Sequence, residues 1–190
     1  MLLTCLVRYL ILLLFNFYYN MAEATIIIDI NGYWREEDLS IILTHPGVFF
    51  VYESKFDPDE HTVDLLSLIY IGEAQNIRER IRTHEKLNLW KNLIRPDSEL
   101  CFATGNVEEY FCERVKTAYV FGNNPVANYG HALQFPFDTT TLISTGKTAL
   151  LKPTFTIKKS FPKYIIDPSS LFQQNLIPVR SVQVERHPAK

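Results

Sequence analysis

Residues 65–84 constrain the fold of this chain most, because an apolar run, a glycine and a helix-like pattern follow one another directly. The apolar run, residues 65–71, is short and ends at Gly72, which favours a strand buried on both faces. Asn76 is an expected N-cap, since its side-chain oxygen can accept a hydrogen bond from a free N–H group of the first helical turn. The stretch therefore predicts a strand that leads into a helix.

The predicted helix places two polar side chains on its apolar face. On a wheel of about 100° per residue, Arg80 and His84 share one arc with Ile77 and Ile81. An amphipathic helix usually keeps arginine on its solvated side. Two interpretations stay open. Arg80 buries its stem and keeps its charge in water while His84 is a boundary residue, or the two side chains belong to a functional site.

The rest of the chain predicts short strands and short helices. Apolar residues at helical spacing predict helices at residues 35–43 and 108–121, and Asn31-Gly32 predicts a turn. Runs rich in β-branched or alternating apolar residues predict strands at residues 24–30, 48–53, 63–71, 99–104, 140–144 and 154–158.

Length and charge indicate one domain with an extension. The 190 residues include 47% hydrophobic residues, which is enough for a core. The net charge is −2, but its distribution is uneven: residues 21–76 carry eleven acidic and two basic side chains, and residues 142–190 carry eight basic and two acidic ones. Such asymmetry can mark a nucleic-acid-facing half, but a dispersed, solvated surface is the interpretation to prefer until the lysines are shown to cluster.

Residues 1–20 decide where the protein is expected to reside. They are strongly apolar but contain Arg8, and Met21 opens a sequence that reads like a cytosolic start. We interpret them as a leader or an over-extended start, while a membrane anchor or a secretion signal stays open. Three irregularly spaced cysteines indicate a reducing compartment. We therefore expect a cytoplasmic protein without a membrane partner.

The order of short motifs between residues 47 and 128 resembles the GIY-YIG nuclease family. The motifs are Gly47-Val48-Phe49, Tyr70-Ile71-Gly72, Arg80, His84 and Asn128. The resemblance implies an α+β fold with a small central, mainly antiparallel three-stranded sheet flanked by helices. It places this domain at residues 21–134, with its core at 47–128, and leaves residues 135–190 as a β-rich C-terminal extension.

The resemblance also implies an activity, metal-dependent phosphodiester hydrolysis by an endonuclease. Arg80, Tyr70 and His84 then form the catalytic set. We expect Arg80, Lys116 and Asn128 to bind the substrate, although Lys116 is not a residue of the family pattern. Arginine suits a phosphate because its planar fork can hold two oxygens and stays charged. The implied partner is nucleic acid, DNA rather than RNA. The implied cofactor is a divalent metal such as Mg²⁺, with no small-molecule cofactor.

Two positions depart from the family pattern. Phe49 replaces the first motif tyrosine and lacks its hydroxyl, and Lys116 occupies the position of the metal-binding glutamate. An ammonium group cannot ligate Mg²⁺. Either Glu113 or Glu109 takes the metal instead, or Lys116 neutralises a phosphate directly. The alternative function is therefore a catalytically degenerate domain that binds nucleic acid or a protein, and whether the chain is an enzyme stays open.

Overall fold

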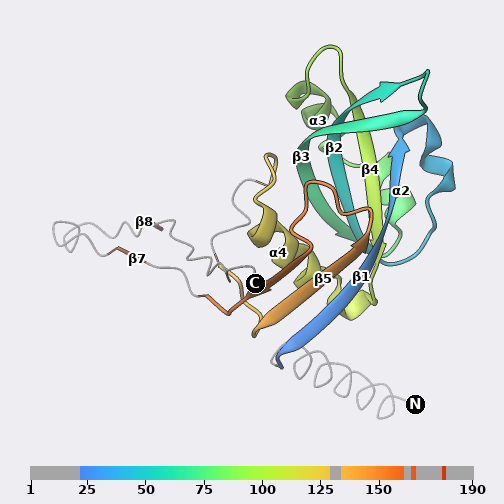
Figure 1. The fold of residues 1–190 in the computed structure, drawn as a ribbon. Coiled ribbons are helices and arrows are strands. Elements are labelled where there is room, and N and C mark those ends of the chain that lie inside the picture. Colours follow the sequence, from blue (N-terminus) through green and yellow to red (C-terminus); the bar gives the residue numbers. More distant parts are fainter. Residues whose placement is uncertain (1–21, 129–133, 161–163, 166–176, 179–190) are drawn as a thin grey trace, which may run out of the picture.

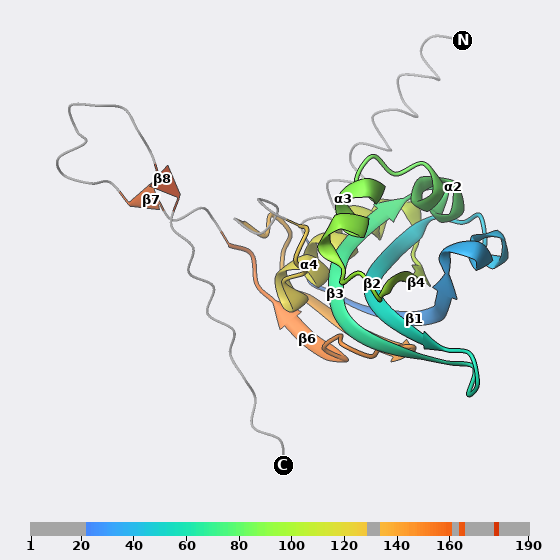
Figure 2. The ribbon, with the colours of Figure 1, turned by 90° about the horizontal axis from the view of Figure 1, so that it is seen from above.

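A six-stranded, curled sheet forms the body of the protein (Figure 1 and Figure 2). The computed structural model describes residues 22–128, 134–160, 164–165 and 177–178, so the interpretations of residues 1–20 fall outside the described residues. The strand order is β3-β2-β4-β1-β5-β6. The sheet strands are β1 (Ala24–Arg35), β2 (Gly47–Asp57), β3 (Thr62–Ala74), β4 (Glu99–Asn106), β5 (Thr140–Gly146) and β6 (Thr154–Ile157).

Short helices cover the sheet. Two are 3₁₀ helices, η1 (Glu36–Ile41) and η2 (Glu109–Phe111), and three are α-helices, α2 (Ile77–Arg82), α3 (Leu87–Leu93) and α4 (Cys112–Asn123). Two-residue strands β7 (Tyr164–Ile165) and β8 (Ile177–Pro178) pair with each other in a separate sheet. Within the described part of the chain, no helix combines the length and the hydropathy that crossing a membrane requires.

The fold class predicted from the sequence is wrong. Strands β3, β2 and β4 do form an antiparallel trio, but they make up only half of a mixed sheet. Strand β1 pairs antiparallel with β4 and parallel with β5, and β6 then extends the sheet beyond β5. The described strands β5 and β6 therefore continue the central sheet.

Strand β1 is longer than predicted because Asn31-Gly32 does not form a turn. Asn31 pairs with Thr104 and Gly32 with Ala103, and β1 continues to Arg35. A Cβ atom on Gly32 would lie 2.9 Å from the carbonyl oxygen of Phe102, so only glycine lets β1 and β4 approach this closely.

The two faces of the sheet pack against different helices. In β2, Phe50 and Tyr52 belong to the cluster that contains α4, whereas Phe49 and Val51 belong to the cluster under α2 and α3. This alternation follows from the two-residue period of a strand and agrees with the sequence pattern. The second cluster also includes Ile77, Ile81 and Trp90. Helix α4 thus lies on the opposite face of the sheet from α2 and α3.

A buried arginine ties α4 to the start of β5. Arg114 is 0% exposed, and its guanidinium donates hydrogen bonds to Thr140 Oγ1 at 2.8 Å, to the carbonyl oxygen of Ala22 at 2.7 Å and to that of Asp138 at 3.1 Å. Burial lowers the pKa of Arg114, but the oxygens around it satisfy its donors. This side chain therefore fixes the ends of β1 and β5 against the helix.

Candidate functional site

A bulge in β3 aims the Tyr70 ring at the helices α2 and α3. Val51 pairs with Tyr70, but the next residue, Tyr52, pairs with Leu68, so β3 carries one extra residue, Ile69. A bulge of this kind can place two consecutive side chains on one face. Ile69 and Tyr70 accordingly both pack on the side of α2 and α3.

Four rings meet under this bulge. The Tyr70 ring centroid lies 5.3 Å from that of His84 and 5.0 Å from that of Trp90, and the His84 and Trp90 centroids are 4.4 Å apart. Phe49 completes the cluster at 5.9 Å from His84. Trp90 and Phe49 are fully buried, whereas Tyr70 is half-buried, so Tyr70 forms the outer surface of the cluster.

His84 is a buried, neutral anchor. Its side chain is 1% exposed, and its Nδ1 accepts a hydrogen bond from the backbone N–H of Lys86 at 3.1 Å. Burial, together with the charge of Arg80, lowers the pKa of His84 to about 4. The ring is therefore neutral at pH 7, with its proton on Nε2 and its Nδ1 lone pair already in use. In this arrangement His84 holds the turn between α2 and α3.

Helix α2 begins as predicted but ends earlier. Asn76 Oδ1 accepts a hydrogen bond from the N–H of Glu79 at 3.2 Å, so the predicted N-cap is confirmed. The helix ends at Arg82, and His84 lies in the following turn, where its N–H donates to the carbonyl oxygen of Ile81 at 3.5 Å. The turn carries His84 inward and leaves its neighbours on the surface.

Two cationic side chains act on Tyr70 at this surface. Arg80 is 41% exposed, and its guanidinium forms a two-pronged ion pair with the Glu85 carboxylate, Nη1 to Oε2 at 2.9 Å and Nη2 to Oε1 at 3.1 Å. The Nζ atom of Lys86 lies 5.1 Å from the Tyr70 ring centroid, which is within cation–π range. We call Tyr70, Arg80, Glu85 and Lys86 the Tyr70 surface.

The Tyr70 phenol stays protonated at neutral pH. Burial raises the pKa of Tyr70, and the nearby charge of Arg80 offsets only part of this effect. The phenol therefore does not act as a phenolate base near pH 7.

Phe49 has a structural role at the position where the resemblance implies a tyrosine. It pairs directly with Gly72 across β2 and β3. A Cβ atom on Gly72 would lie 2.2 Å from Phe49 Cζ, so the ring rests on the glycine backbone. The packing of Phe49 therefore requires a glycine at position 72.

Asn128 connects the chain after α4 to strand β3. Its Oδ1 accepts from the N–H of Ile71 and its Nδ2 donates to the carbonyl oxygen of Ile71, both at 2.9 Å. Both ends of the amide are therefore engaged with the backbone next to Tyr70. This geometry makes Asn128 a positioning residue, and its predicted contact with a substrate stays a prediction.

The structure does not bring the α4 candidates to the Tyr70 surface. Lys116 and the exposed Glu113 lie on α4, which packs on the other face of the sheet. Glu109, in η2, accepts a hydrogen bond from Gln75 in the connection between β3 and α2. Across the residues that the structure describes, no three His, Cys, Asp or Glu side chains are grouped closely enough to hold a metal ion.

Three residues of the site escaped the sequence analysis. Glu85 and Lys86 lie beyond the end of α2, in the turn that follows it, where a helical wheel does not apply. Trp90 lies in α3 and reaches the site by packing against His84. Thr83, β-branched and next to His84, was a signal that the helix could end there.

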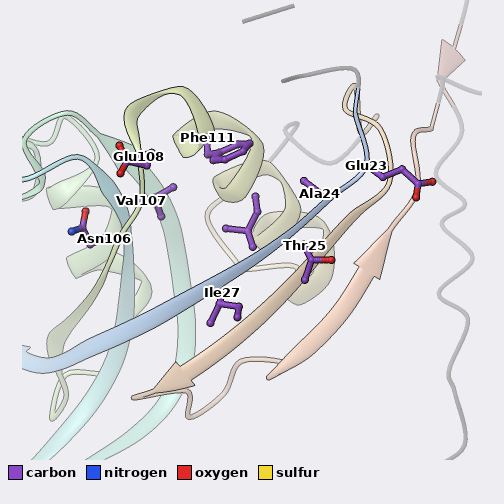
Figure 3. A pocket seen from close by; sticks show the side chains of 9 residues that line it. Glu23, Ala24, Thr25, Ile27, Asn106, Val107, Glu108 and Phe111 are labelled. Carbon is purple, nitrogen blue, oxygen red and sulfur yellow. The ribbon is translucent and has the colours of Figure 1, made fainter. Parts of the chain in front are cut away.

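An open groove of about 580 Å³ lies along the first residues of β1 (Figure 3). It is lined by Thr25 and Ile27 of β1 and by Val107 and Phe111 near η2, with Glu23 and Glu108 also among the lining residues. None of the residues of the Tyr70 surface lines it. The groove is therefore separate from the candidate site.

Comparison of the chain with family models, with curated proteins and with solved structures gives no match.

Proposed function

We propose that this chain binds nucleic acid through the Tyr70 surface and does not hydrolyse it. The observation that carries the proposal is the Lys86 ammonium over the half-buried Tyr70 ring, together with the exposed Arg80 guanidinium, whose charge acts on the Tyr70 phenol. A planar guanidinium can hold two oxygens of a phosphate, and an ammonium adds a second charge nearby. Nucleic acid presents such phosphates at regular intervals.

The surroundings of Arg80 add further positive charge. Arg78 and Arg82 lie on the same short helix, and Arg82 is exposed. Arg78 donates a hydrogen bond from Nε to the carbonyl oxygen of Ile42 at 2.5 Å, which anchors the helix to the segment after η1. Residues 77–86 carry four basic and two acidic side chains, and this net positive charge attracts a polyanion with little dependence on sequence.

The residues at the motif positions favour binding over hydrolysis. Phe49 is buried and has no hydroxyl to order a water molecule, and the Nδ1 lone pair of His84 is already used by Lys86 N–H. Lys116 offers an ammonium where the resemblance implies a metal-ligating carboxylate, and a cation repels Mg²⁺. An endonuclease that uses Glu113 or Glu109 for Mg²⁺ is the alternative that the experiment must exclude.

The test is titration of a fluorescently labelled DNA duplex, with an RNA duplex of the same sequence in parallel, followed by anisotropy. We expect binding that weakens as salt rises. Arg80→Ala should weaken it and lower the slope of log K against log salt by about 1. The matched control is Arg82→Ala on the same helix, which removes an equal charge from an exposed side chain outside the Tyr70 surface and should have a smaller effect.

Incubation of the same duplex with Mg²⁺ tests the second half of the proposal. We expect intact strands on a denaturing gel at every Mg²⁺ concentration. Nicking that requires Mg²⁺ and disappears in Arg80→Ala would establish the endonuclease instead. Absence of salt-sensitive binding to either duplex would contradict nucleic-acid binding itself.

A further inference from the structure

The guanidinium of Arg80 already holds an oxyanion, the carboxylate of Glu85. Both oxygens of Glu85 contact the two terminal nitrogens of Arg80, at 2.9 and 3.1 Å. A phosphate would present two oxygens to the same two nitrogens. Glu85 and a phosphate therefore compete for one set of donors.

The turn around His84 holds Glu85 in this position. His84 is buried among Trp90, Tyr70 and Phe49, and its Nδ1 accepts from the N–H of Lys86, so the residues on either side of Glu85 are fixed. The Glu85 side chain itself is 62% exposed and Arg80 is 41% exposed. The pair is thus pre-arranged by the backbone but open to solvent, where an incoming anion can reach it.

The electrostatics of the turn keep Glu85 charged. Hydrogen bonds from its own backbone N–H and from Arg80 hold the pKa of Glu85 below its usual value. An exposed ion pair of this kind contributes little to stability, so replacing it by another anion costs little.

We propose that Glu85 is an internal competitor of phosphate, so that nucleic acid reaches Arg80 only by displacing the Glu85 carboxylate. The inference rests on the proposed function for the identity of the physiological ligand, but the competition itself is a property of the Arg80–Glu85 pair. Glu85 then lowers the affinity of the Tyr70 surface for phosphate, and neutralising the Glu85 carboxylate strengthens phosphate binding.

The test compares Glu85→Gln with Glu79→Gln, with inorganic phosphate as the probe. Both changes remove one negative charge close to Arg80, but Glu79 is an exposed α2 residue that forms no ion pair with Arg80 in the described structure. Binding is followed by the NMR signal of the Arg80 Nε–H group. We expect Glu85→Gln to bind phosphate about two- to fivefold more tightly than the unmodified chain, and Glu79→Gln to show a clearly smaller gain.

A double-mutant comparison separates displacement from general electrostatics. In an Arg80→Lys background, where the two-pronged pair cannot form, the gain from Glu85→Gln should shrink toward that of Glu79→Gln. An equal gain in both glutamine variants, no gain in Glu85→Gln, or no phosphate binding by any variant would overturn the inference.

The same variants in the DNA titration distinguish the two proposals. Tighter phosphate binding by Glu85→Gln with no DNA binding by any variant means that the competition is real and the proposed function is wrong. DNA binding that Arg80→Ala weakens, together with unchanged phosphate affinity in Glu85→Gln, means that the function holds and the competition does not exist.

Discussion

The imidazole of His84 and the indole of Trp90 lie against each other, with ring centroids 4.4 Å apart and planes tilted by 40°. Both side chains are buried, and the Trp90 Nε1 atom has no hydrogen-bond partner among the described residues. A neutral ring tolerates this apolar contact, whereas a charged imidazolium would lose its hydration. The contact therefore couples the protonation of His84 to the packing of the whole site.

Acidification should destabilise the protein through His84. The unfolded chain takes up a proton near pH 6.5, but the folded chain does so only near pH 4, so this contribution to stability is full above pH 6.5 and is lost as the pH falls to about 4. It amounts to at most about 3 kcal/mol. Urea unfolding measures the unfolding free energy of the unmodified chain and of His84→Leu. The value for the unmodified chain minus that for His84→Leu should decrease as the pH is lowered from 6.5 to about 4. A constant difference would contradict the prediction.

Tyr70 should act in binding through its ring and not through its hydroxyl. Tyr70→Phe keeps the surface that faces Lys86 and should change DNA affinity by less than about twofold, whereas Tyr70→Ala removes it and should cost about two- to fivefold. Anisotropy measures both. If Tyr70→Phe abolishes a Mg²⁺-dependent cleavage, the hydroxyl is catalytic and the binding-only function fails.

Removal of the Asn128 amide should destabilise the fold next to the site. Asn128→Ala leaves the N–H and the carbonyl oxygen of Ile71 without their buried partner, which should lower the unfolding free energy by about 2 kcal/mol. Val126→Ala, a truncation of a nearby exposed side chain, should cost well under about 1 kcal/mol. Chemical denaturation of both variants provides the measurement, and equal losses would refute the role assigned to Asn128.

The buried guanidinium of Arg114 should be one of the most sensitive positions of the chain. Arg114→Met keeps the apolar stem but removes the donors to Thr140, Ala22 and Asp138, so the unfolding free energy should fall by about 3 kcal/mol. The neighbouring exposed change Glu113→Gln is the control and should stay within about 0.5 kcal/mol. Thermal or urea unfolding measures both losses. Equal losses of unfolding free energy in the two variants would show that the hydrogen bonds of Arg114 contribute little to stability.

Local patterns in the sequence predicted the individual elements well. The strands predicted at residues 48–53, 63–71, 99–104, 140–144 and 154–158 are confirmed, as is the N-cap at Asn76. These features depend on neighbours along the chain, which a sequence displays directly. The helix predicted at residues 35–43 is a shorter 3₁₀ helix, Glu36–Ile41.

Long-range pairing and the exact course of the turn escaped prediction for a physical reason. The parallel pairing of β1 with β5 has no signature in the local sequence of either strand, so the number of strands in the sheet was underestimated. The arc of Ile77, Arg80, Ile81 and His84 assumed a continuous helix, but α2 ends at Arg82. The rings of Tyr70 and His84 nevertheless lie in contact, and Glu85 reaches Arg80 from the turn that follows α2.

The parallel pairing of β1 with β5 also bears on how the chain folds during synthesis. Ala24 pairs with Thr140 and Ile30 with Gly146, so the pairing joins residues 116 positions apart. A chain that leaves the ribosome must carry one edge of β1 unpaired until β5 has emerged, and exposed strand edges are where nascent chains aggregate. Contacts of such long sequence separation also form slowly. Slower translation before residue 140 would therefore lengthen the period in which this edge of β1 is exposed.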